Sequence, residues 1–237
     1  MRPSRRLPAP ALAFSLVLVP LVGCAFNPPT VPPPPPIDIP LNDSPQNTMT
    51  RFKMTYEYQL QPEYVGLLTT DFRYTFSNES DPALAAKYGP NWGKDAEAES
   101  ASNLFDGFTS STTGAFLPGA SNIAMTLHAV QYFDDPAHAD SAAWYKWVVV
   151  SRVEMTIEIP GTPDPQIYNI DARHEFYLVR GDAALLDPGQ EARADRWYIR
   201  RWDDLSTNPV PTTIAGGPPV GPDGDRSWGA FKDSFVR

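Results

Sequence analysis

The sequence predicts an α+β fold in which helices come first and a long, mostly antiparallel sheet follows. Apolar residues near the start of the folded region recur at steps of three and four, as in amphipathic helices. The second half contains four long runs that are typical of strands. Short, turn-rich segments join most of these runs, which favours antiparallel pairing, and helices followed by strands indicate the α+β class.

The first helix is predicted to begin at Ser44-Pro45, with serine as the N-cap and proline in the first helical turn. Its apolar stripe consists of Met49, Phe52, Tyr56 and Leu60. A short second helix restarts at 61–62, and the alternation over 71–76 predicts a strand.

Two more helices are expected, one from Asp81-Pro82 to Gly89 and one from about 93 to 106, where Gly107 ends it. Residues 108–120 are rich in Ser, Thr and Gly and are predicted to form a loop. The predicted strands of the second half are 121–133, 145–159, 166–180 and 195–203. The Pro- and Gly-rich tail ends with Trp228, Phe231 and Phe235, which are spaced three and four residues apart. This spacing predicts a short helix that docks on the domain.

The first 23 residues have the order of a secretory signal, with three arginines followed by an apolar run over 9–22. This run holds two prolines and is shorter than the roughly 20 apolar residues that a membrane span needs. It ends in Leu21-Val22-Gly23-Cys24, which resembles the lipobox of bacterial lipoproteins. The resemblance implies that Cys24 becomes the first residue of the mature chain and carries acyl chains.

A lipid anchor on Cys24 would make the membrane a partner and place the protein in the bacterial cell envelope. Ala25 stands where some lipoproteins of the inner membrane have Asp, which favours the outer membrane, facing the periplasm. The Pro-rich segment 24–43 is predicted to be a polyproline tether with a reach of roughly 60 Å at about 3.1 Å per residue. The alternative is a ligand for a proline-binding domain. The expected organisation is a signal peptide over 1–23, this tether, an α+β domain over 44–206 and a tail over 207–237.

Composition excludes several classes of function. Cys24 is the only cysteine, so no disulfide within the chain is expected. The net charge of −9 leaves no basic stripe for nucleic acid. The three histidines lack metal-ligand spacing, and no nucleotide-binding or nucleophile motif is present, so no metal or cofactor is implied.

The order of helix, helix, strand, helix and four long strands resembles the nuclear transport factor 2-like (NTF2-like) superfamily. The segments that carry the likeness are Tyr64–Tyr74 and Arg196–Asp204. This superfamily includes ketosteroid isomerase, scytalone dehydratase and SnoaL-like proteins. The resemblance, which covers about residues 44–205, implies a cone in which a curved, cystatin-like sheet wraps the first helix and a pocket opens inside. The superfamily includes enzymes and binding modules alike, so the fold does not determine the function.

Alternation along the strands predicts which side chains face this pocket. The expected pocket-lining residues are Tyr74, Gln131, Ser151, Tyr168, His174, Phe176, Trp197 and Arg201. No Asp or Glu is predicted on an apolar strand face, and Asp203-Asp204 is expected to be a solvated strand end. A ketosteroid-isomerase-like proton shuttle would need such a carboxylate.

His174 is the candidate general base, and the alternative is a core histidine whose ring is satisfied by hydrogen bonds. The leading hypothesis is therefore a non-catalytic, membrane-tethered cone that binds a small apolar ligand or a partner protein. The alternatives are a SnoaL-like isomerase or hydratase that uses His174, and a scaffold subunit that forms homodimers through its sheet face.

Overall fold

The computed structural model describes residues 37–79, 81–111, 113–161, 166–181, 185–186, 194–207 and 227–236. The helices and strands below belong to one compact unit, Asp38–Arg237. The predicted signal peptide, Cys24 and most of the predicted tether lie outside the described residues. Asn42, near the end of the predicted tether, already pairs with the domain, because its backbone oxygen accepts a hydrogen bond from the Trp197 amide at 2.7 Å.

The described helices lie close to the predicted positions. Ser44 caps the first helix by accepting a hydrogen bond from the amide of Asn47 at 3.1 Å. The helices are α1 (Pro45–Glu57), α2 (Gln61–Val65), α3 (Pro82–Tyr88), α4 (Lys94–Asp106) and α5 (Trp228–Asp233). A 3-10 helix, η1 (Pro136–Ser141), and a small hairpin of β3 (Phe108–Thr109) and β4 (Phe116–Leu117) lie in segments that the sequence predicted as turn and loop.

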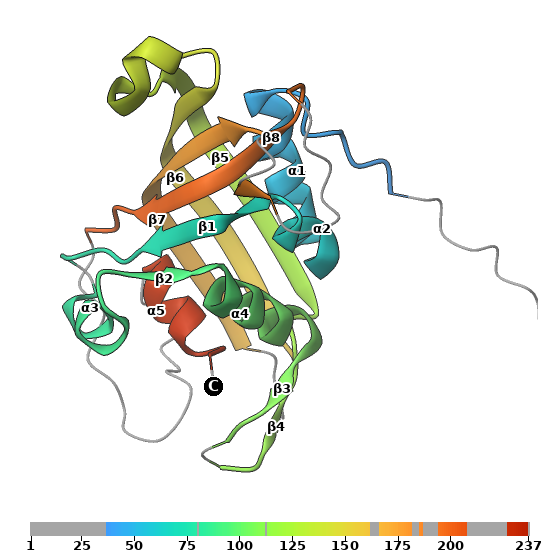
Figure 1. Cartoon of the computed structure of the whole chain (residues 1–237). Coiled ribbons are helices and arrows are strands. Elements are labelled where there is room, and N and C mark those ends of the chain that lie inside the picture. The colour runs from blue at the N-terminus through green and yellow to red at the C-terminus, as the bar shows by residue number, and fades with distance from the viewer. Residues whose placement is uncertain are drawn as a thin grey trace, which may run out of the picture. The chain divides into compact units, whose positions relative to one another are not determined.

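The main sheet has the strand order β2-β1-β8-β7-β6-β5 (Figure 1). Its strands are β1 (Leu68–Thr75), β2 (Asn91–Gly93), β5 (Asn122–Asp134), β6 (Tyr145–Ile159), β7 (Gln166–Arg180) and β8 (Trp197–Asp204). Neighbouring strands pair antiparallel, except that β1 and β8 are parallel. The predicted α+β class with a mostly antiparallel sheet is therefore confirmed, and the parallel pair places the first long strand beside the last.

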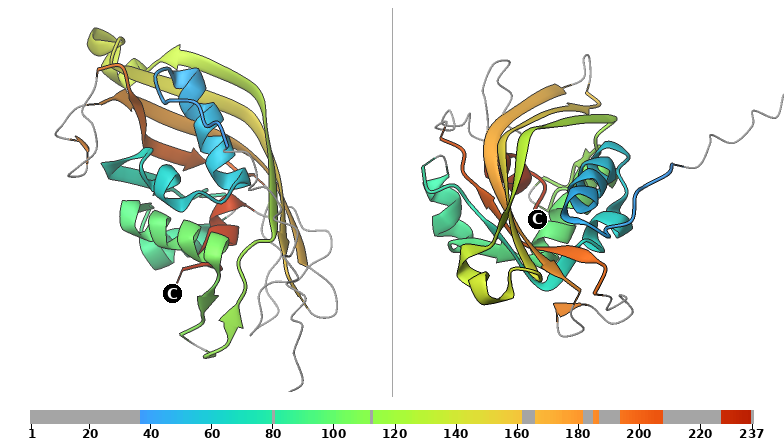
Figure 2. Two further views of the ribbon diagram at one scale, coloured as in Figure 1. Left: turned by 90° about the vertical axis from the view of Figure 1, so that its right-hand side faces the viewer. Right: turned by 90° about the horizontal axis from the view of Figure 1, so that it is seen from above.

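The sheet is strongly curved, and Figure 2 shows α1 on its concave side. Aromatic side chains from the helices and strands meet there. The Phe52 ring of α1 lies 5.2 Å from that of Phe176 on β7 and 5.1 Å from that of Trp202 on β8. The Tyr56 ring lies 5.5 Å from that of Phe105 on α4. Burial of these large rings is the main source of stability expected for a domain without disulfides.

Local irregularities in β5, β6 and β8 change which side chains of these strands point inward. The register of β6 against β7 shifts between Val150 and Val153, and that of β7 against β8 shifts at Tyr177. Ala129 in β5 has a φ of 46°, in the left-handed region that a non-glycine residue seldom adopts. Such a bulge changes which alternate residues point inward.

Candidate functional site

The inward placement predicted for Gln131 and Ser151 is wrong, since both side chains are exposed. Gln131 lies on β5 and Ser151 on β6. The inward alternation of these strands is interrupted at Ala129 in β5 and between Val150 and Val153 in β6. On the other side of the shift in β6, Val148 and Val150, rather than Val149 and Ser151, are fully buried. Simple alternation across the whole strand therefore assigned both polar residues to the wrong face.

Arg201 is likewise not inside, because the bulge in β8 turns it to the outer face, where about half of its side chain is exposed. The same bulge turns Asp204 inward, and that residue is 1% exposed. Asp203 is also buried. The predictions of a solvated strand end at Asp203-Asp204 and of an inner face without a carboxylate are therefore wrong.

The structure places the other candidates inside or at the rim. Tyr74, His174, Phe176 and Trp197 are buried, and Tyr168 is half-buried. Tyr168 packs on α5, its ring 5.4 Å from that of Phe231. Of the eight predicted residues, His174 and Tyr74 both meet the carboxylate of Asp204 in the interior.

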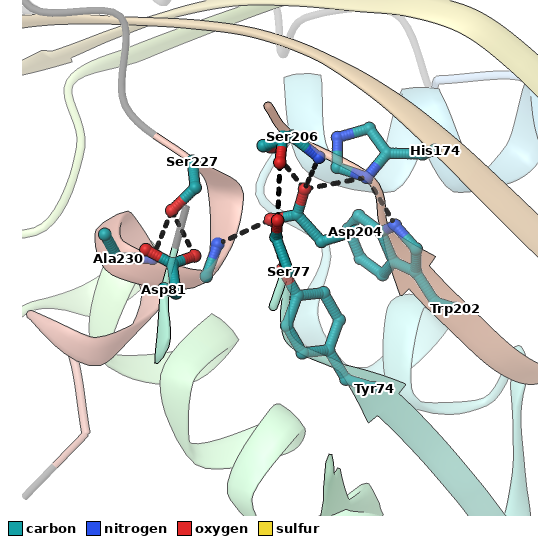
Figure 3. Close-up of polar contacts among 10 residues, drawn as sticks. Tyr74, Ser77, Asp81, His174, Trp202, Asp204, Ser206, Ser227 and Ala230 are labelled. Atoms are coloured by element: carbon teal, nitrogen blue, oxygen red, sulfur yellow. Dashed lines mark hydrogen bonds and ion pairs between the residues drawn. The ribbon is translucent and has the colours of Figure 1, made fainter. Parts of the chain in front are cut away.

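His174 and Asp204 lie opposite each other on β7 and β8, with Nδ1 4.0 Å from Oδ1 (Figure 3). The indole Nε1 of Trp202 donates a hydrogen bond to His174 Nδ1 at 3.1 Å. Burial lowers the pKa of His174, although the Asp204 carboxylate acts in the opposite direction. The imidazole is thus neutral at neutral pH. Its lone pair on Nδ1 is occupied by the indole and is not free to accept a proton from a substrate.

Asp204 is held by donors on both of its oxygens. Oδ2 accepts hydrogen bonds from the Tyr74 hydroxyl at 2.9 Å and from the Gly229 amide at 3.0 Å. Oδ1 accepts from the amide and the hydroxyl of Ser206, the amide at 2.9 Å. Gly229 belongs to the first turn of α5, so the carboxylate ties the start of this helix to β8. Burial, followed by the charge of Asp204, raises the pKa of the Tyr74 hydroxyl well above its usual value.

The helix α5 fills the interior in which the NTF2-like resemblance implied a pocket. Trp228 and Phe231 are each 1% exposed. The Trp228 ring lies 5.5 Å from that of Tyr56 and 5.8 Å from that of Trp202, so it joins α1 to β8. Phe235, just after α5, continues this contact, its ring 5.0 Å from that of Phe231.

A buried ion pair lies in the same interior. The Lys232 ammonium of α5 contacts the Glu97 carboxylate of α4, and both side chains are almost fully buried. Glu97 also accepts hydrogen bonds from the Tyr64 hydroxyl and from the Trp92 indole, the latter at 2.9 Å. The ammonium lies 3.9 Å from the centre of the Trp202 ring. Burial lowers the pKa of Lys232 to about 8, with Glu97 opposing the shift, so the amine is protonated at neutral pH.

Further side chains form hydrogen bonds with both ends of α5. The Ser227 hydroxyl, which caps the helix, donates to Asp81, whose pKa burial raises to about 6. Asn103 Nδ2 donates to the backbone oxygen of Phe235 at 2.6 Å. Outside, Asp233 accepts from Lys87 at 2.7 Å and from the Tyr88 hydroxyl at 2.6 Å. The tail helix is therefore an integral part of the core.

Three pockets of about 200 to 300 Å³ lie elsewhere on the described domain, and neither His174 nor Asp204 lines any of them. The smallest, at the rim beside α5, is largely apolar and includes Tyr168, Phe231 and Phe235. Another lies on the outer face of the sheet and includes Arg201. No helix in the described ranges is long and apolar enough to span a membrane. Within the same ranges, no three His, Cys, Asp or Glu side chains group as metal ligands would.

Sequence reasoning missed Asp204, Glu97 and Lys232. Lys232 stands one residue after Phe231 in the spacing that predicted the tail helix. Glu97 lies next to Ala96, which begins a weak apolar stripe of Ala96, Ser100 and Leu104 in the helix predicted over 93–106. A charged residue at the border of an apolar stripe was the signal that both positions offered. Nothing in the pattern around Asp204 indicated the bulge that turns it inward.

No protein-family model matches the sequence, and no curated protein matches it. Solved structures that resemble the chain include an uncharacterized protein with a cystatin-like fold from Caulobacter vibrioides, at TM-score 0.42 and 11% identity over 69% of this chain and 87% of that one. A ketosteroid isomerase-like protein from Erwinia carotovora atroseptica has TM-score 0.38 and 14% identity over 68% and 93%. An NTF2-like protein of unknown function in nutrient uptake from Rhodospirillum rubrum has TM-score 0.37 and 11% identity over 67% and 94%. At such identities and TM-scores, these likenesses carry nothing about activity to this chain.

Proposed function

We propose that the protein is a lipid-anchored component of the bacterial envelope whose cone domain is non-catalytic and binds a partner protein. The observation that carries the proposal is the filling of the interior by α5. The candidate base His174 is fully buried and its Nδ1 is engaged by Trp202. A histidine without an open lone pair and without contact with solvent is a structural residue in this conformation.

The outer surface supports partner binding better than the interior supports ligand binding. Phe133 and Trp144 are each 43% exposed, at the ends of the segments that flank η1. The Phe133 ring lies 5.3 Å from that of Trp147, and the Arg180 guanidinium lies 5.8 Å from the centre of the Trp144 ring. Aromatic and arginine side chains of this kind are enriched in protein interfaces.

The homodimer through the sheet face stays a prediction. The outer face of β6 and β7 carries paired charges, among them Arg152 with Asp171 at 2.7 Å and Arg173 with Glu175 at 2.8 Å. A dimer built on this face would have to desolvate these pairs, which is costly.

Modification by diethyl pyrocarbonate tests whether His174 is sealed. We expect His128 and His138, whose side chains are 41% and 38% exposed, to be carbethoxylated in the native chain, while His174 stays unmodified. Peptide mass spectrometry reads all three sites in one sample, so the two exposed histidines serve as internal controls. In urea all three should react.

A second function, a SnoaL-like isomerase or hydratase, is favoured by one observation. His174 faces the carboxylate of Asp204 across 4.0 Å, and the Tyr74 hydroxyl binds the same carboxylate. Such a group could move protons if α5 withdrew to admit a substrate and the Trp202 indole released Nδ1. Carbethoxylation of His174 at a rate close to that of His138 in the native chain would favour this enzyme and contradict the sealed interior.

The anchor is tested separately. Radioactive palmitate should label the wild-type chain and be absent from Cys24→Ser, because the thiol is the attachment point that the lipobox implies. The variant should also leave the membrane fraction, since acyl chains supply the membrane affinity in this proposal. Labelling that persists in Cys24→Ser, or an unlabelled wild type, contradicts the lipoprotein assignment.

A further inference from the structure

A pocket of about 240 Å³ on the outer face of the sheet is built from β1, β8, β7 and the segment around η1. It lies on the side of the sheet opposite the interior that α5 fills. Three arginines line it, namely Arg73, Arg200 and Arg201. Asp71 and Asp135 line it as well, so the pocket carries charges of both signs.

The bulge in β8 brings two of these arginines together. In a regular strand, consecutive side chains point to opposite faces. Here Arg200 and Arg201 both line the outer pocket, because the register of β8 against β7 shifts at this point. The parallel register of β1 then sets Arg73 directly beside Arg201.

The carboxylates nearby are already committed to two of the three guanidinium groups. Asp71 pairs with Arg200 at 2.7 Å, and Asp203 accepts two hydrogen bonds from Arg201. Arg73 forms no ion pair with any residue that the structure describes. Arg73 and Arg201 are register partners on neighbouring strands, where like charges are unfavourable, so an anion bound to Arg73 would be stabilising.

Flat side chains form the other side of the pocket. The His138 ring is stacked on that of Tyr145, with centroids 3.8 Å apart and an interplanar angle of 11°. Asp135 holds His138 through Nδ1 at 2.8 Å. The Arg201 guanidinium covers the Tyr177 ring, 4.6 Å from its centre. These contacts hold planar groups in place beside the arginines.

We propose that this pocket binds a small planar organic carboxylate, with the carboxylate on Arg73 and the ring against the His138–Tyr145 stack. The fork of a guanidinium matches a carboxylate with two parallel hydrogen bonds, which makes arginine the preferred partner. The pocket is smaller than the several hundred Å³ typical of sites for drug-sized molecules, so the ligand is about the size of one substituted ring.

Benzoate is the probe that tests the site on the full-length chain, with benzamide as its neutral counterpart. Titrations followed by amide chemical shifts in NMR spectra should show saturable benzoate binding centred on Arg73 and η1, and no such binding of benzamide. Arg73→Ala should weaken the affinity by about tenfold or more, because it removes the charge-assisted pair. Arg173→Ala is the matched control, since it removes an exposed arginine from the same sheet face, and it should leave the affinity unchanged.

Three results would overturn the proposal. These are benzoate shifts that do not saturate, equal affinities in Arg73→Ala and the wild type, and binding of benzamide as strong as that of benzoate. Inorganic phosphate tests whether the ring contributes to binding, because it is an anion without a ring. His138→Ala should weaken benzoate binding and leave any phosphate binding unaffected. If phosphate binds as tightly as benzoate, the assignment to planar carboxylates is wrong.

Discussion

Lys232→Met should lower the free energy of unfolding by about 3–5 kcal/mol, which is typical when one partner of a buried ion pair is removed. The substitution keeps an unbranched chain of similar length and removes the ammonium. Glu97 would then remain charged in the core without a cation beside it, although the Tyr64 hydroxyl and the Trp92 indole still donate to it. The loss should appear as a lower urea midpoint in equilibrium unfolding followed by tryptophan fluorescence.

Two variants show whether the buried pair is the cause. Lys87→Met removes a lysine that also binds α5, through Asp233, but its side chain is 55% exposed, so a loss of at most about 1 kcal/mol is expected. The double variant Lys232→Met with Glu97→Gln should recover much of the lost stability, because no unpaired charge remains. Equal effects of Lys232→Met and Lys87→Met would contradict a charge-paired core.

Trp228→Ala is expected to cost about 3–5 kcal/mol, as for other large-to-small changes of buried aromatic residues. Trp228 is 1% exposed and contacts the rings of Tyr56, Trp202 and Phe231. A helix as short as α5 has little stability of its own, so its position depends on these contacts. The variant should unfold at lower urea and bind the dye ANS in buffer, as aromatic surface becomes accessible.

Trp144→Ala provides the matched control for this experiment. It is the same substitution at a residue that is 43% exposed, so a much smaller change in stability and no increase in ANS fluorescence are expected. If Trp228→Ala behaved like Trp144→Ala, α5 would be a dispensable cover rather than part of the core. The interior could then open readily, which is what the enzymatic alternative requires.

Lys232→Met and Trp228→Ala both test how firmly α5 is held, which is the question that separates the two proposed functions. Residues of several helices and strands contact α5. Asp204 of β8 binds its first turn, Glu97 of α4 binds Lys232, and Asn103 binds the backbone of Phe235. A helix fixed from so many directions favours the non-catalytic domain.

Much of the fold was predictable because it depends on local patterns. The stripe of α1, its Ser44 cap and the alternation of the long strands are properties of neighbouring residues, and the structure has these elements within a few positions of the prediction. The spacing of Trp228, Phe231 and Phe235 likewise corresponds to a helix that packs on the domain. Periodicity of this kind reports which residues must leave water, whatever the final topology.

The site was less predictable because alternation was extended across irregular strands. One bulge exchanged Ser151 for Val150 on the inner face, and another exchanged Arg201 for Asp204. A bulge adds one residue and reverses every later side chain, and its position depends on how two strands fit together. The propensities of the residues in one strand do not predict how that strand fits its neighbour.

The sequence by itself determined the α+β class, the order of its elements and the acidic charge, since these follow from composition and from periods of two and 3.6 residues. Only the tertiary structure decided that the interior is occupied by α5, that Lys232 meets Glu97 there, and that His174 faces Asp204. Lys232 and Glu97 lie 135 residues apart along the chain, and His174 and Asp204 lie on neighbouring strands whose register shifts at a bulge. Their encounter therefore depends on sheet register and on burial. Contacts of this kind arise when distant segments share one core, and no local pattern contains them.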